Sequence, residues 1–105
     1  MNPAHWAFHA IQALAQGESC TVTPHGTSML PRIASGATVA LVPPSSARID
    51  PETVVLVKVK GNIYLHLVKA IRGKDDAVEF LIGNNKGGLN GWVSHRSVYG
   101  VATNV

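Results

Sequence analysis

The 105-residue chain is expected to be a mainly β protein with one N-terminal α-helix, forming a single domain over residues 1–105. Helical spacing of apolar residues is confined to residues 3–15, whereas short β-branched runs separated by turn residues fill residues 20–105. The connections between runs are of hairpin length, which is typical of antiparallel sheets. Apolar residues make up 46% of the chain and charged residues 14%, which favours a packed core over disorder.

The N-terminal helix is expected over residues 3–15. Asn2 is placed to cap its first turn, Pro3 suits the first helical position, and Gly17 is placed to end the helix. Apolar residues recur at helical spacing in two rows: Trp6, Ala10, Ala13 and Leu14, and Phe8, Ile11 and Ala15. The helix is therefore expected to be amphipathic and to pack on the sheet, where it could cover an edge strand.

The rest of the chain is expected to form short strands. They are predicted at residues 20–23, 37–42, 54–59, 63–71, 78–82, 92–93 and 98–102. Gly61-Asn62 is typical of a tight hairpin turn, and a second turn is expected at residues 73–76. Residues 43–51 and 83–91 are rich in Pro, Ser, Gly or Asn and are therefore expected to be loops.

Charge and cysteine content narrow the classes of function. The net charge is +3, but the nine Lys and Arg residues are scattered, so no nucleic-acid partner is expected. Cys20 is the only cysteine, which excludes an intrachain disulfide. His5 and His9 lie four residues apart on the predicted helix and could form a metal-binding pair, but no further ligand is evident. We therefore expect both histidines to lie on the helix surface, and we expect no metal and no other cofactor. No apolar run is long enough to span a bilayer, which predicts a soluble, cytoplasmic protein.

The run Gly26-Thr27-Ser28-Met29-Leu30-Pro31 is the strongest candidate for chemistry. Gly26 permits a positive φ or a close backbone approach, and Pro31 restricts both itself and the residue before it. Together they favour a fixed bend that presents Ser28. Taken alone, this short motif is interpreted more simply as an ordinary serine-containing turn.

The same run resembles the nucleophile box of the type I signal peptidase and LexA-like serine peptidase superfamily, with Gly-x-Ser-Met-x-Pro at its centre. Three later segments resemble that family in the same order: residues 62–71, 83–85 and 98–102. The resemblance covers roughly residues 17–105. It implies the family's coiled antiparallel β-sheets, and a serine peptidase that acts on a peptide or protein substrate bound as an extended strand.

The resemblance also assigns roles to residues. It makes Ser28 the nucleophile and His66 its general base, where the family usually has a lysine. The ordinary pKa of histidine, about 6.5, suits a base that works near neutral pH. Lys69 is the alternative base, and because it lies three residues further along the same strand, only one of the two can face Ser28.

The surroundings of this pair are predicted as follows. The backbone N–H of Ser28, with Thr27 as a further contributor, is expected to form the oxyanion hole. Met29 is expected to pack beneath the substrate groove. Asn84 is the expected orienting residue for His66, at a position where the histidine branch of the family usually has an aspartate.

Departures from the family pattern leave two functions open. Ala37 stands where the family often has Asp, Leu67 where it has Arg, and Asn84 lacks the charge of a carboxylate. The chain is expected to be a Ser/His peptidase of weak activity. The alternative is a catalytically inactive member of the same fold that serves as a protein-binding or dimerisation module. A homodimer is compatible with either function.

Overall fold

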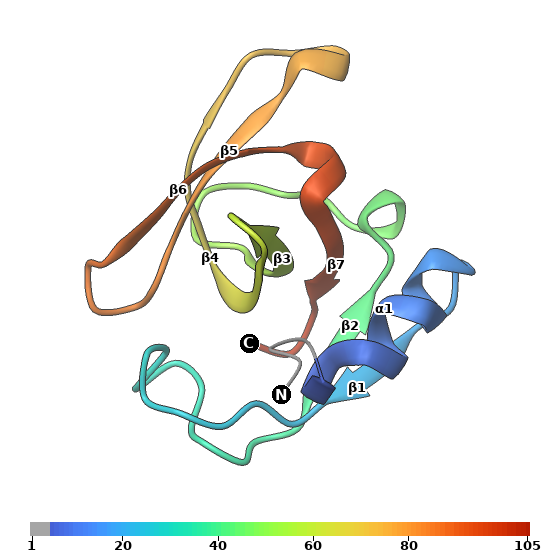
Figure 1. The fold of residues 1–105 in the computed structure, drawn as a ribbon, viewed down its shortest axis with the longest axis vertical. Helices are drawn as coiled ribbons and strands as arrows, with labels where there is room; N and C mark the ends of the chain where they lie inside the picture. The colour runs from blue at the N-terminus through green and yellow to red at the C-terminus, as the bar shows by residue number, and fades with distance from the viewer. Residues whose placement is uncertain (1–4) are drawn as a thin grey trace.

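The computed structural model describes residues 5–105 and is mainly β with one α-helix (Figure 1). The strands are β1 (Cys20–Val22), β2 (Val39–Val42), β3 (Val54–Val59), β4 (Asn62–Arg72), β5 (Glu79–Gly83), β6 (Leu89–Ser94) and β7 (Val98–Ala102). The α-helix is α1 (Phe8–Ala15), and the 3-10 turns are η1 (His5–Ala7), η2 (Pro44–Ser46), η3 (Asp75–Ala77) and η4 (His95–Ser97). The predicted β-rich class with one N-terminal helix is confirmed.

The strands form one antiparallel sheet in the order β1-β2-β7-β3-β4-β5-β6. The last strand in sequence, β7, lies between β2 and β3 and so joins the two halves of the sheet. The sheet curls, so that β6 also contacts β3 (Figure 1). Hairpins therefore build one half of the sheet, from β3 to β6, and the return of the C-terminus completes it.

Each face of the curled sheet has its own apolar core. One core lies beneath α1 and the long segment between β1 and β2, and includes Ala10, Leu14, Met29, Ile33, Leu41, Leu56, Leu65 and Leu67. The other includes Val55, Val57, Val68, Phe80, Ile82, Val98 and Val101. In the first core, a Cβ atom on Gly100 would lie 2.7 Å from Cδ1 of Leu14, so the bare glycine backbone lets α1 approach β7.

The N-terminal helix begins with the 3-10 turn η1, and its α-helical part is only α1. Asn2 and Pro3, its predicted first residues, lie outside the described residues. Its end agrees with the prediction, because Gly17 N–H and Glu18 N–H donate to carbonyls of the last turn. Only one of the two apolar rows is well buried, since Phe8 is 53% exposed. Among residues 5–105, no helix has the length and apolarity required to cross a membrane.

Two predicted connections differ from the structure. Val59 pairs with Asn62, so the β3–β4 turn consists of Lys60 and Gly61, one residue earlier than predicted. The predicted loop 83–91 shrinks to residues 84–88, because pairing with β5 draws the flanking Gly- and Asn-rich residues into strands. Tertiary pairing thus overrides the weak strand propensity of these residues.

The Lys60–Gly61 turn leads to a stability prediction. Both residues have positive φ, 51° and 84°, as a type I′ turn requires. A lysine in this region is strained, whereas asparagine adopts it readily. We expect Lys60→Asn to raise the free energy of unfolding by up to about 1 kcal/mol, measured by urea denaturation. Lys58→Asn, on the exposed face of β3, is the control. An equal gain in the free energy of unfolding from this variant would show that relief of the positive φ at Lys60 is not the cause.

Candidate active site

Ser28, His66 and Asn90 form a chain of hydrogen bonds. Ser28 Oγ lies 3.1 Å from His66 Nε2, and His66 Nδ1 lies 2.7 Å from Asn90 Oδ1. An amide oxygen only accepts, so Nδ1–H donates to Asn90. This tautomer leaves a lone pair on Nε2, and the Ser28 hydroxyl donates to it. The imidazole is therefore set up to take a proton from Ser28.

β4 holds His66 in a mostly apolar setting. His66 pairs with Val55 of β3 and is 7% exposed. Tyr64, two residues earlier on the same face, stacks on its ring with a centroid distance of 4.8 Å. Burial lowers the pKa of the His66 imidazole below its ordinary 6.5, while the hydrogen bond to Asn90 opposes that shift. His66 is therefore neutral near pH 7, as a general base must be.

The turn that contains Gly26 presents Ser28 to His66. Gly26 has φ of +125° and no atom within 4 Å of a Cβ built on it, so backbone conformation, and not close approach, requires glycine there. The N–H of Gly26 donates to Ser35 Oγ at 3.0 Å. Met29 is buried in the core beneath the turn, which leaves its neighbour Ser28 exposed. This burial agrees with a packing role for Met29, and its place beneath a substrate groove stays a prediction.

Asn85 ties the Ser28 turn to the β5–β6 hairpin. Its backbone N–H donates to the Ser28 carbonyl at 3.0 Å, and its side-chain Nδ2 donates to the Leu30 carbonyl at 2.9 Å. The same hairpin carries Asn90 on β6. One hairpin therefore holds both the turn that carries Ser28 and the side chain that is bonded to His66.

This arrangement predicts the effect of Asn85→Ala. The substitution removes the side-chain bond to Leu30 and leaves its carbonyl without that donor, which should cost about 1 kcal/mol of unfolding free energy. The looser turn should also slow covalent labelling of Ser28 by a fluorophosphonate about tenfold. Denaturation and labelling rates measure the two effects. Lys86→Ala, at the exposed neighbouring residue, is the control, and equal losses in both variants would contradict the proposed tie.

Asn84, the predicted orienting residue, is not the residue that is hydrogen-bonded to His66. Its Oδ1 accepts the N–H groups of Lys86 at 2.8 Å and Gly88 at 2.9 Å, which closes the hairpin loop. The side chain is thus engaged in its own turn, as asparagine side chains often are. Asn90 takes the position beside His66 instead.

Lys69, the alternative base, is the extra residue of a β-bulge. Val68 pairs with Ile82 and Ala70 pairs with Leu81, which leaves Lys69 unpaired between them. In the part of the chain that the structure describes, the hydrogen-bond partner of Ser28 Oγ is His66 and not Lys69. The geometry therefore favours His66 of the two predicted bases.

The expected oxyanion donors lie on the same turn. Within residues 5–105, the N–H of Ser28 has no hydrogen-bond acceptor, so it is free to donate to a bound group. The side chain of Thr27 is exposed. The contribution of either group to an oxyanion hole stays a prediction.

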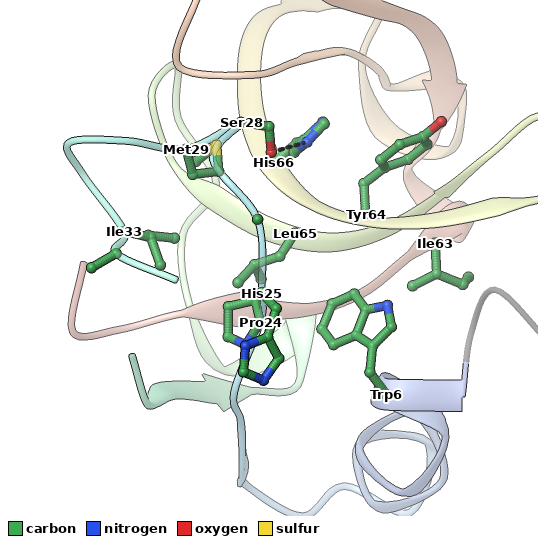
Figure 2. Close-up of a pocket in the computed structure, with 12 residues that line it drawn as sticks. Trp6, Pro24, His25, Ser28, Met29, Ile33, Ile63, Tyr64, Leu65 and His66 are labelled. Atoms are coloured by element: carbon green, nitrogen blue, oxygen red, sulfur yellow. Dashed lines mark hydrogen bonds between the residues drawn. The ribbon is translucent and has the colours of Figure 1, made fainter. Parts of the chain in front are cut away.

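A mainly apolar cavity of about 270 Å³ adjoins Ser28 and His66 (Figure 2). It lies between the turn that carries Ser28 and the first half of β4. β4 pairs with β5 only from Leu67 onward, so within the described residues its segment 62–66 has a strand neighbour on one side alone. The lining residues are Trp6, Pro24, His25, Gly26, Ser28, Met29, Ile33, Ala34, Ile63, Tyr64, Leu65 and His66.

Sequence reasoning missed several residues of this site. Asn90 and Asn85 lie in a Gly/Asn-rich stretch whose composition predicts a loop and gives no sign of which asparagine faces His66. Trp6 was expected only as part of the apolar stripe of the N-terminal helix. His25 had no assigned role, and it lines the cavity. Each depends on long-range contacts that no local pattern encodes.

Other candidate groups give no competing chemistry. Burial raises the pKa of the Cys20 thiol, which favours the protonated form and disfavours a nucleophilic role. His9 Nε2–H donates to the Thr21 carbonyl at 3.3 Å. The side chain of His5 lies outside the described residues, so the predicted metal pair stays a prediction. Elsewhere in the described chain, no three His, Cys, Asp or Glu side chains gather as a metal site would require.

The depressed pKa of His66 predicts a pH dependence of stability. The unfolded chain protonates this residue near pH 6.5, whereas the folded chain does so only at lower pH. As the pH falls through 6.5, the unfolded state takes up a proton first, so the free energy of unfolding decreases. We expect His66→Gln to weaken this decrease between pH 7.5 and 5.5, measured by urea denaturation. The same pH slope in both proteins would contradict the assignment.

Comparison of the chain with protein-family models, with curated proteins and with solved structures gives no match in any of the three.

Proposed function

We propose that this protein is a serine peptidase that uses Ser28 as nucleophile and His66 as general base. The main observation in its support is the chain of hydrogen bonds from Ser28 through His66 to Asn90. In this chain the His66 imidazole is buried and neutral and carries its proton on Nδ1. The resemblance of residues 26–31 to the signal peptidase and LexA-like nucleophile box gives independent support. A 3.1 Å separation is what a catalytic pair needs and what a purely structural module does not require.

The geometry leads to a two-step acyl transfer. His66 Nε2 takes the hydroxyl proton as Ser28 Oγ attacks the scissile carbonyl carbon, and the N–H of Ser28 donates to the developing oxyanion. His66 then gives that proton to the departing amine as the C–N bond breaks. Water hydrolyses the acyl ester by the same steps, with His66 again as base, and restores the Ser28 hydroxyl.

The neutral side chain of Asn90 determines how fast peptide hydrolysis is expected to be. It holds the productive tautomer, as asparagine does in Cys-His-Asn peptidases. It carries no charge, so it stabilises the imidazolium less than a carboxylate would. The activity is therefore expected to be slow compared with that of Ser-His-Asp enzymes.

The cavity favours an extended peptide as substrate. The segment of β4 from residue 62 to 66 leaves one edge without a strand neighbour among the described residues, and that edge borders Ser28. A peptide added as a strand would gain main-chain hydrogen bonds there. Its side chains would then alternate between the cavity and solvent.

Two measurements test the proposal. A fluorophosphonate probe should add to the wild-type protein and not to Ser28→Ala, as read by intact mass. Incubation with a proteome-derived peptide library should give cleavage products with the wild type only. Wild type that neither reacts with the probe nor cleaves any peptide would overturn the proposal and favour the binding or dimerisation module.

A further inference from the structure

The cavity beside the candidate nucleophile extends well beyond it. Figure 2 shows Ser28 and His66 at one end, and Trp6, Pro24 and Ile63 towards the other. The residues of this far end come from three separate parts of the chain: the 3-10 turn η1, the segment after β1, and the first half of β4. The far end is thus formed by the tertiary structure, and it includes an indole that no catalytic step uses.

The size of the cavity fits side chains better than a whole ligand. Its volume of about 270 Å³ is below the roughly 300–1,000 Å³ that is usual for sites of drug-sized ligands. A cavity of about 150 Å³ is large enough to admit benzene. There is therefore room for one bulky side chain in the far end in addition to whatever lies beside Ser28.

The lining determines which side chains can enter. No Asp, Glu, Lys or Arg is among the residues that line the cavity. A charged side chain would lose hydration there and gain no ionic partner, which is unfavourable. A leucine, methionine or phenylalanine side chain would instead exchange water for contact with Trp6 and Ile63.

We propose that the far end of the cavity is a specificity subsite for one bulky apolar side chain, with Trp6 as its main determinant. The subsite rests on the proposed function in that its ligand is an extended peptide that passes Ser28. Trp6 lies on the N-terminal η1 turn, outside the β region that holds Ser28 and His66. The N-terminal segment thereby contributes directly to substrate selection.

Peptide binding to the Ser28→Ala protein tests the subsite without any catalysis. The probes are fluorescein-labelled decapeptides of Ala and Ser in which one Phe, Leu or Lys is moved through each position, with binding followed by anisotropy. At one position, Phe and Leu should tighten binding at least about tenfold over Ala, and Lys should not. The additional substitution Trp6→Ala should abolish that preference, whereas Trp6→Phe, which keeps an aromatic wall, should retain it.

Phe8→Ala is the matched control, because Phe8 follows η1 directly, is 53% exposed and does not line the cavity. Equal binding of Ala and Phe peptides at every position, no binding of any peptide, or a preference that survives Trp6→Ala would each overturn the subsite.

Fluorophosphonate labelling of the wild type tests the peptidase separately. Labelling without a Phe preference defeats the subsite alone. A Phe preference in a protein whose wild type neither reacts with the probe nor cleaves any peptide supports the subsite and defeats the peptidase proposal.

Discussion

Ser28→Ala is expected to abolish covalent labelling by a fluorophosphonate and hydrolysis of any peptide that the wild type cleaves. In the proposed mechanism the Ser28 hydroxyl is the attacking group, so alanine removes the nucleophile. His66→Ala should lower the labelling rate by a factor of about 10³ or more, because among residues 5–105 the side chain bonded to Ser28 Oγ is that of His66. The two losses should not add in the double variant, since both residues serve the same step. Intact-mass time courses measure each rate.

The pH profile of labelling distinguishes His66 from Lys69. Labelling requires neutral imidazole, so the rate should rise with pH through a midpoint below 6.5 and level off towards pH 7.5. Lys69→Ala should keep both the rate and this midpoint, because Ser28 is bonded to His66 and not to the bulge lysine. A profile that rises only in the alkaline range and is lost in Lys69→Ala would show that Lys69 is the base.

Asn90→Leu is expected to have the second largest effect. Leucine is similar in size but cannot accept the Nδ1–H bond of 2.7 Å, so the imidazole loses both its orientation and its preferred tautomer. In a serine protease, loss of the correct tautomer costs about 10⁴ in turnover, and here we expect a fall of about 10² to 10⁴ in labelling rate. Circular dichroism checks that the variant folds. A rate within threefold of wild type would contradict the orienting role.

Asn90→Asp provides the complementary test. A carboxylate beside Nδ1 stabilises imidazolium, so the pKa of His66 should rise and the midpoint of labelling should move to higher pH than in the wild type. At pH 8, where the base is neutral in both proteins, the variant should be the faster one. Asn84→Asp is the matched control, because its carboxylate can still accept the loop N–H groups of Lys86 and Gly88 without touching His66. An unchanged midpoint in Asn90→Asp would contradict direct coupling to His66.

Local chemistry makes part of the site predictable. Gly26 permits the positive φ before Ser28 and Pro31 restricts the backbone after it, and these local preferences favour a turn without reference to the rest of the chain. The alternation along β4 separates His66 from Lys69 by the same local rule. The geometry of one strand and one turn is therefore accessible to sequence reasoning, and the pairing of Ser28 with His66 came from the resemblance.

The sequence by itself determined the β-rich class, the succession of short strands along the chain, the helix end near Gly17 and the bend at Ser28, because these depend on periodicity and on intrinsic backbone preferences. Only the tertiary structure decided that Asn90 is hydrogen-bonded to His66, that Asn85 is hydrogen-bonded to the turn that carries Ser28 and that Trp6 lines the cavity. Asn84, Asn85 and Asn90 have the same side chain and similar Gly-rich neighbours, so composition does not distinguish them. Their roles are set by the pairing register of β5 with β6 and by the curl of the sheet, which bring groups far apart in sequence within hydrogen-bond distance.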